Sequence, residues 1–324
     1  MRNGLSGFAR ITAVAGAALL LLVLGWVLCQ PNFGGLPFPG RARADSAALE
    51  SHVRFLAVTD PPRNWRSPAG LSRAAAHILS AFERSGAACS EQAYRARKGE
   101  MKNIIAHFGP TSGPLVVVGA HYDVFGELPG ADDNASGVAG LLELARLFDG
   151  VRLSGPVELV AYSTEEPPFF GGAEMGSAVH AASLVRAGTP VRAMVCLEMI
   201  GYFSATQPDR AFLLRFFYPS RGDLIGLIGR FGDRGLVRLG KKCFRGATAV
   251  RAVSYSGPTV FGSDLSDHRN YWAAGFPAIM VCDTAYLRNP NYHEAGDTAD
   301  TLDYRRMAGV VDGVLSLVVH LAND

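Results

Sequence analysis

Apolar and polar positions divide the chain into an uncharged N-terminal run and a body with changing periodicity. Residues 11–29, ITAVAGAALLLLVLGWVLC, contain no charged side chain. After residue 45, apolar residues recur every three to four positions over Ser46–Val58 and Leu71–Arg84, which predicts two amphipathic helices. Glu91–Arg97 and Met101–His107 flank a Lys98-Gly99 turn and predict a pair of strands.

Strand-like and helical patterns then alternate to the end of the chain. Further strands are predicted at Pro114–Gly119, Val157–Tyr162, Ala193–Leu197, Phe212–Phe217 and Ala278–Val281. Further helices are predicted at Asn134–Phe148, Glu174–Arg186, Leu224–Phe231 and Tyr304–Leu321. This order predicts an α/β fold in a single domain, with a central mixed, mostly parallel sheet flanked by helices.

The N-terminal run is long enough to cross a bilayer as a helix, and Arg2 and Arg10 before it favour an N-terminus in the cytoplasm. We therefore expect residues 1–30 to be a membrane anchor or uncleaved signal, residues 31–50 a linker, and residues 51–324 one folded domain. The body would face the periplasm or the exterior. Cleavage after the small-residue triplet at 42–44 would instead give a secreted protein.

Composition and charge exclude several classes of protein. The chain is 48% hydrophobic and 19% charged, which is too apolar and too balanced in charge for a disordered protein. Residues 1–44 carry four arginines and no acid, so the remainder has 27 basic and 29 acidic residues and is mildly acidic. No basic stripe stands out, and we expect no nucleic-acid partner.

Four cysteines lie beyond the apolar run, and none forms a CxxC pair. Cys196 and Cys282 fall within strand-like stretches, so they are expected to be buried free thiols. An exported body would permit a disulfide, but its connectivity does not follow from the sequence.

Histidines and acids follow the predicted strands. Their positions are His121 and Asp123, Asp132 and Asp133, Glu165 and Glu166, Glu198, and His293. In open α/β sheets, ligands bind beyond the carboxyl ends of the strands, so these side chains are expected at one edge of the sheet. Carboxylates gathered there repel each other unless protons or cations neutralise them.

The residue types at this edge indicate the metal. Imidazole and carboxylate without thiolate suit zinc or a related divalent ion. Two histidines and four or more acids exceed what one catalytic zinc needs, so two ions sharing a bridging carboxylate fit better.

Together these motifs resemble the zinc-dependent exopeptidases of the M28 type, which include aminopeptidases. The resemblance covers most of residues 51–324. It rests on HYD at 121–123, GADDNASG at 130–137, EE at 165–166, LEMIG at 197–201, SDH at 266–268, and His293 with Asp297-Thr298. A bacterial membrane-anchored subgroup is similar in EEPPFF, LEMIGYFS and DTAYLRNPNYH. The resemblance implies the phosphorylase/hydrolase-like fold of zinc exopeptidases and makes residues 51–324 the catalytic domain.

The resemblance also implies a role for each matched residue. Asp133 would bridge two zinc ions, with His121 and Glu198 completing one site and Glu166 and His293 the other. Glu165 would be the general base. Glu198 departs from the Asp common in the family, which puts the occupancy of its site in doubt.

Other residues near these motifs are expected to support the site. Asp123 would accept a hydrogen bond from the far nitrogen of His121, and Asp297 would orient the His293 loop. Asp267 and His268 would have supporting or structural roles. Tyr286, Arg288 and Tyr292 precede His293, so one of them is expected to bind substrate or the developing oxyanion, with loop packing as the alternative.

These observations predict a membrane-anchored aminopeptidase that hydrolyses peptide substrates outside the cytoplasm. A glutaminyl-peptide cyclase, which shares the fold but uses one zinc, is the alternative enzyme. A non-catalytic binding domain is the alternative outside enzymes, although all five ligand positions and the base are filled.

Overall fold

One mixed sheet of eight strands runs through the body in the order β1-β2-β4-β3-β5-β8-β6-β7. The computed structural model describes residues 7–29, 34–207, 218–260 and 262–324. The strands are β1 (Ala88–Ala96), β2 (Gly99–Phe108), β3 (Leu115–His121), β4 (Val157–Tyr162), β5 (Val191–Glu198), β6 (Leu224–Gly229), β7 (Arg251–Ser256) and β8 (Ala278–Cys282). The four central strands β4, β3, β5 and β8 are mutually parallel, whereas β2 and β6 pair antiparallel with them.

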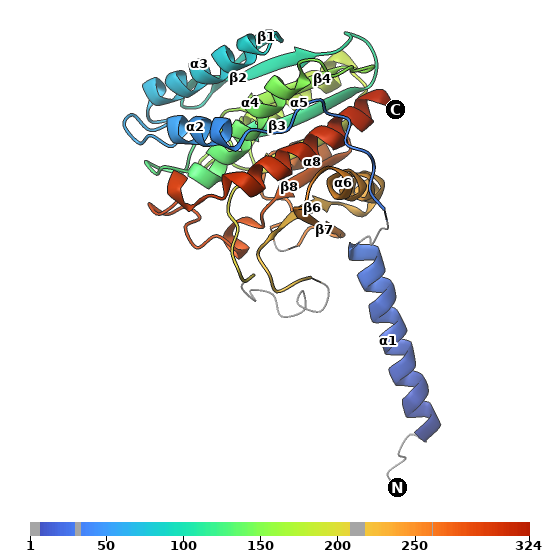
Figure 1. Ribbon diagram of the computed structural model, residues 1–324. Helices are drawn as coiled ribbons and strands as arrows, with labels where there is room; N and C mark the ends of the chain where they lie inside the picture. The colour runs from blue at the N-terminus through green and yellow to red at the C-terminus, as the bar shows by residue number, and fades with distance from the viewer. Residues whose placement is uncertain (1–6, 30–33, 208–217, 261) are drawn as a thin grey trace.

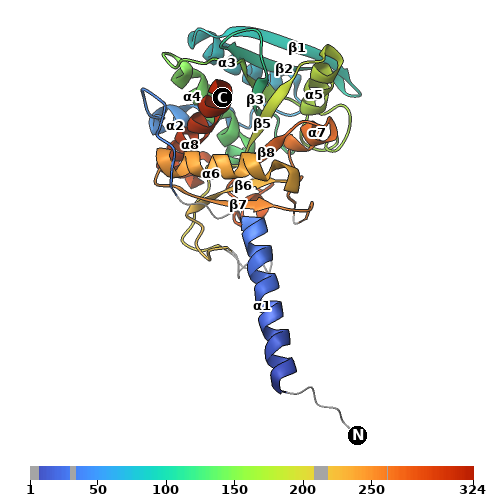
Figure 2. The same ribbon diagram turned by 90° about the vertical axis from the view of Figure 1, so that its right-hand side faces the viewer.

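Helices cover both faces of this sheet, as Figure 2 shows. The helices α2 (Ser46–Leu56), α3 (Pro68–Arg84), α4 (Gly137–Phe148), α6 (Arg234–Ala247) and α8 (Tyr304–Asn323) share one large apolar cluster. Helices α5 (Gly176–Ala187) and α7 (His268–Ala273) pack on the opposite face. Because both faces are covered, every side chain of β3 is buried, and the strand is an almost continuous apolar run.

The arrangement confirms the predicted sheet and most of the predicted elements. The helix predicted at Leu224–Phe231 is wrong, because Leu224–Gly229 forms strand β6. A six-residue apolar run has no clear period, and here pairing with β7 and β8 decides its conformation. Helices α6 and α7 and strand β7 were not predicted from the sequence. The strand predicted at Phe212–Phe217 lies outside the described residues.

Within the part of the chain that the structure describes, two helices are long and apolar enough to cross a membrane. Helix α8 is largely buried in the body and is a core helix. In contrast, α1 (Gly7–Cys29) projects away from the body, and its window Arg10–Cys29 is entirely unburied (Figure 1). Of these two described helices, α1 is therefore the one with the surroundings expected of a membrane span.

The chain that follows α1 packs against the body before α2 begins. The Leu36 amide donates to the Lys242 carbonyl at 3.0 Å, and the Ala44 amide donates to Asp312 at 3.0 Å. Helix α2 begins at Ser46, inside the segment predicted to be linker, and three of its apolar residues are buried. The segment from residue 34 onward is thus part of the folded surface.

Substitution at Gly246 tests the contact between this segment and α6. A Cβ on Gly246 would overlap the Leu36 carbonyl oxygen, whereas a Cβ on Gly235 of the same helix meets nothing within 4 Å. We expect Gly246→Ala to destabilise the full chain by about 1–3 kcal/mol through overpacking. Gly235→Ala should be neutral or stabilising by up to about 1 kcal/mol. Equilibrium unfolding in detergent measures both, and equal effects would contradict the proposed clash.

Candidate metal centre

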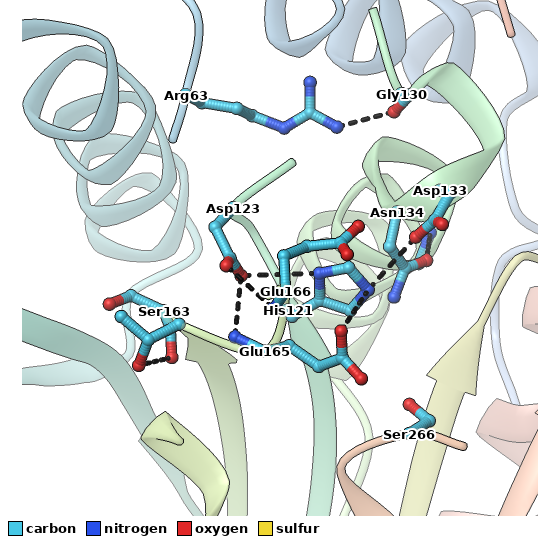
Figure 3. A network of polar contacts seen from close by, with 12 residues as sticks. Arg63, His121, Asp123, Gly130, Asp133, Asn134, Ser163, Glu165, Glu166 and Ser266 are labelled. Carbon is cyan, nitrogen blue, oxygen red and sulfur yellow. Dashed lines mark hydrogen bonds and ion pairs between the residues drawn. The ribbon is translucent and has the colours of Figure 1, made fainter. Parts of the chain in front are cut away.

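The ends of neighbouring strands bring the candidate ligands together. His121 is the last residue of β3, Glu198 is the last residue of β5, and Glu165 and Glu166 follow β4. Asp133 lies in the helical turn η1 (Ala131–Ser136) between β3 and α4. The parallel direction of β3, β4 and β5 places these segments at the same edge of the sheet. Figure 3 shows the side chains of His121, Asp133, Glu165 and Glu166 converging there.

Asp133 lies between two histidines, and each of its carboxylate oxygens faces one of them. Its Oδ1 is 3.2 Å from His121 Nε2, and its Oδ2 is 3.1 Å from His293 Nε2. Glu198 Oε2 is 3.5 Å from His121 Nε2, and Glu166 Oε1 is 3.4 Å from His293 Nε2. The cluster therefore has two halves, each with one histidine and one glutamate, which share Asp133.

Glu165 lies beside the His121 half of the cluster. Its Oε2 is 4.0 Å from His121 Nε2, and ligand-type atoms of Glu165, Glu166 and His121 lie within 4.8 Å of one another. Adjacent residues thus place Glu166 toward His293 and Glu165 toward His121, as the alternation of an extended segment allows.

Two buried aspartates hold the backbone on which these acids sit. Asp123 accepts the amides of Glu165 and Glu166, both at 3.0 Å. Asp297 accepts the amides of Asp132 and Asp133 at 2.9 and 3.0 Å. Each carboxylate therefore fixes two successive residues, and Asp297 links the His293 loop to the Asp133 segment.

The hydrogen bond expected between Asp123 and His121 is poorly formed. His121 Nδ1 lies 3.4 Å from Asp123 Oδ1 and has no hydrogen-bond partner of good geometry among the described residues. The carboxylate of Asp123 instead lies in line with the two amides of the Glu165 segment (Figure 3).

The turn η1 also fixes the segment that follows β5. Asn134 Oδ1 accepts the Met199 amide, Ser136 Oγ accepts the Ile200 amide, and Asp132 Oδ1 accepts the Gly201 amide, at 2.9–3.1 Å. Asn134 Oδ1 also accepts the Gly137 amide at the start of α4. Asp132 thus holds backbone and is not near either histidine, while its neighbour Asp133 faces both.

Within the SDH motif, Ser266 is the residue that touches a candidate ligand. Its hydroxyl donates to Glu198 Oε2 at 2.5 Å, so it fixes the longer glutamate side chain. Asp267 is fully buried, its carboxylate oxygens have no hydrogen-bond partner of good geometry among the described residues, and burial raises its pKa to about 7. His268 donates from Nε2 to the Ser263 carbonyl, and burial lowers its pKa to about 4, which indicates a structural role.

The three residues before His293 that were predicted to bind substrate have different surroundings in the structure. Tyr292 and Phe125 stack on the His293 ring at 4.0 and 4.1 Å between centroids and fix its plane. The ring of Tyr286 lies 5.9 Å from that of Tyr292. Arg288 is 2% exposed and donates to the Leu224 carbonyl and Gln207, so its guanidinium ties the fold together and is not available to substrate.

The candidate ligands are buried, and the pKa values of their acids are shifted far from the usual ones. Burial, together with Glu166 and Glu198, raises the pKa of Glu165 well above its usual value against the lowering effect of His121. Burial also raises the pKa of Glu166 to about 7. Asp133 differs, because hydrogen bonds from His121 and His293 outweigh its burial and lower its pKa.

This arrangement fits divalent cations. Two sets of three residues, His121–Asp133–Glu198 and Asp133–Glu166–His293, each offer ligand-type atoms within 4.8 Å of one another. Glu166 Oε1 is buried without a hydrogen-bond partner among the described residues. Four buried carboxylates around two imidazoles repel each other unless cations offset their charge, and the donor set suits zinc.

Arg63 was not anticipated from the sequence. It is 1% exposed and donates to the carbonyls of Leu56, Pro129 and Gly130. Figure 3 shows its guanidinium above the cluster, where it holds the loop that leads into η1. No local sequence pattern marks a single arginine that is buried by loops distant along the chain.

Comparison with known protein families gives a match over most of the body. The model for peptidase family M28 matches residues 103–318. An Escherichia coli protein described as uncharacterised protein YfbL is 45% identical over 90% of this chain and 93% of its own. Leucine aminopeptidase 1 of Coccidioides posadasii is 26% identical over 80% of this chain and 67% of its own.

Solved structures share the fold at low identity. The LapA aminopeptidase of Legionella pneumophila superposes with a TM-score of 0.71 over 87% of this chain and 73% of its own, at 22% identity. A Porphyromonas gingivalis glutaminyl cyclase gives 0.64 over 85% of this chain and 98% of its own, at 21% identity. The fold alone therefore does not separate the two reactions.

The pKa shifts predict how pH affects the metal-free protein. Against burial, the facing carboxylates of Asp133 and Glu166 raise the pKa of His293 from 6.5 to about 10, and burial raises the pKa of Glu166 from 4.5 to about 7. The folded chain therefore binds more protons than the unfolded chain above pH 6.5, and its stability must fall as pH rises. We expect its unfolding midpoint to drop by more than about 3 °C between pH 6.5 and 8.5.

Saturating zinc provides the control for this pH series. Its stabilisation should increase over the same range, because metal ligands bind in their deprotonated forms. If the unfolding midpoint of the metal-free protein stays constant or rises with pH, the raised pKa values of His293 and Glu166 are wrong.

Proposed function

The chain belongs to peptidase family M28, and we propose that it is a zinc-dependent aminopeptidase acting on peptides outside the cytoplasm. The observation that carries this proposal is the carboxylate of Asp133, whose two oxygens face His121 and His293 at 3.2 and 3.1 Å. Such a carboxylate suits a bridge between two ions. The aminopeptidase relatives and structural neighbours support the reaction class.

We assign two zinc ions to the two halves of the cluster. His121, Asp133 and Glu198 would hold one ion, and Asp133, Glu166 and His293 would hold the other. Zinc bound at such a site polarises the scissile carbonyl and lowers the pKa of the attacking water toward about 7.

Glu165 is the proposed general base. Its carboxylate accepts a proton from the water as the water oxygen attacks the scissile carbonyl carbon. It then delivers that proton to the nitrogen of the leaving amine as the C–N bond breaks. Asp123 supports this role by fixing the Glu165 and Glu166 amides, so that one side chain stays free while its neighbour binds metal.

Tyr292 is the proposed polar contact for substrate on the His293 loop. Its ring packs on His293, and burial together with the acids of the cluster raises the pKa of Tyr292 well above its usual value. The hydroxyl therefore stays protonated at neutral pH and can donate to a carbonyl oxygen that gains negative charge.

We propose that α1 anchors the chain in a membrane. The window Arg10–Cys29 has a mean hydropathy of 2.5 and is unburied. Retention of this segment is supported by the packing of residues 36–44 on the body, since cleavage after Ala44 would remove the contacts that Leu36 and Arg43 make with α6 and α8. Arg2 and Arg10 favour a body outside the cytoplasm.

Glu165→Gln tests the base. We expect kcat on an amino-acid anilide to fall by about 10²–10⁴-fold, because the amide cannot accept the proton, while zinc content stays unchanged. Glu100→Gln, an exposed glutamate on β2, is the matched control and should retain wild-type activity. Both are measured on the full chain in detergent.

Two outcomes would overturn this assignment. Wild-type turnover by Glu165→Gln would remove Glu165 from the role of base. Cyclisation of N-terminal glutaminyl peptides by the wild-type chain, without anilide hydrolysis, would favour the glutaminyl-cyclase reaction of its structural neighbour.

Ser266→Ala tests the Glu198 site separately. Loss of the hydroxyl frees Glu198 Oε2, and we expect zinc affinity at one of two sites to weaken by about 10–100-fold. Ser256→Ala, at a buried serine whose hydroxyl has no hydrogen-bond partner among the described residues, is the control. Titration with a zinc chelator measures both, and identical curves would contradict a role for Ser266.

A further inference from the structure

Helix α6 carries a row of cations along one side. Arg234, Arg238, Lys241 and Arg245 are spaced four, three and four residues apart, so at 3.6 residues per turn they lie within about 60° of one another around the helix axis. The three arginines are exposed, and the sequence has no acid between Asp233 and Asp264. We call these four residues the α6 cation row. The row was not predicted from the sequence, because helix α6 was not predicted.

The cation row faces the end of the N-terminal helix. Lys241 Nζ donates to the Cys29 carbonyl at 2.7 Å, and Ser254 Oγ of β7 donates to the same oxygen at 2.6 Å. Because the three arginines of the row lie within about 60° of Lys241 around the helix axis, they extend from the same side of α6 as Lys241. Figures 1 and 2 show α6 lying crosswise to α1, close to its upper end.

The length of α1 sets the level of this contact relative to a bilayer. Residues 11–29 span about 28 Å at 1.5 Å per residue, close to the roughly 30 Å hydrocarbon thickness. Arg10 precedes the span, and Trp26, a residue type enriched at membrane interfaces, lies 57% exposed near its other end. Cys29 is therefore at the headgroup level, and its carbonyl contacts the body directly.

We propose that the α6 cation row binds anionic phospholipid headgroups of the bilayer that α1 crosses. This inference rests on the membrane anchoring proposed above. A cluster of cations held at the headgroup level is attracted to an anionic surface, and each cation contributes about fivefold to the association. Together with α1, the row would fix the tilt of the body, and so the direction in which the catalytic site faces. A soluble polyanion is the competing occupant.

Hydrogen exchange of the full chain in lipid discs tests the proposal. Exchange of the α6 peptide, residues 234–247, should be at least about fivefold slower in discs of 70:30 phosphatidylcholine and phosphatidylglycerol than in discs of phosphatidylcholine alone at 50 mM NaCl. The difference should vanish at 0.5 M NaCl, because salt screens the attraction. The α5 peptide, residues 176–187, should exchange equally in both.

Two triple variants with the same change in net charge distinguish the α6 cation row from the overall charge of the body. Arg234→Gln, Arg238→Gln and Arg245→Gln together should abolish the lipid difference. Arg95→Gln, Lys98→Gln and Arg186→Gln together, at exposed positions on β1, the β1–β2 turn and α5, should preserve it. Unfolding midpoints in neutral detergent identify any variant that has lost its fold.

The outcomes separate this inference from the proposed function. A chain that fails to stay in the discs at 0.5 M NaCl would contradict the anchor itself. A chain that stays in the discs but exchanges equally in both lipids would overturn only the headgroup contact. Equal protection by soluble glycerol phosphate or heparin would assign the row to a soluble polyanion instead, and anilide hydrolysis would be unaffected in every case.

Discussion

The carboxylate of Asp133, buried between His121 and His293, is the interaction on which the rest of the site depends. It joins two groups of ligands that would otherwise be separate clusters of like charge. Burial of Glu165, Glu166 and Glu198 around it raises the pKa of each, so the site is stable at neutral pH only with protons or cations bound. A pair of divalent ions would remove that cost and leave Glu165 ionised for its proposed role as base.

The fold positions the side chains of this cluster by fixing the backbone that carries them. Parallel strands deliver His121, Glu198 and the Glu165–Glu166 pair to one edge, and buried aspartates then accept pairs of successive amides beside them. Each acid is thus held through its own main chain as well as through its side chain. Supporting residues of this kind orient ligands and tune their affinity for metal.

Much of this arrangement could be predicted because it depends on local patterns. The buried run of β3, the strand ends and the spacing of His121 and Asp133 are visible in the sequence. Ser266, Arg63 and the backbone role of Asp123 could not be predicted, since their partners lie far away in the chain. Strand β6 was mistaken for a helix because its six apolar residues take their conformation from neighbouring strands. That error also hid α6 and its cation row.

The segment that follows α1 belongs to the same folded unit as the candidate metal centre, because Leu36 and Ala44 donate to α6 and α8 before helix α2 begins. Anomalous X-ray diffraction from crystals of the full chain grown with zinc would show whether Asp133 joins two metal ions. We expect two zinc peaks about 3.5–4 Å apart, one beside each oxygen of Asp133. A single peak, or two peaks without Asp133 between them, would contradict that role of Asp133.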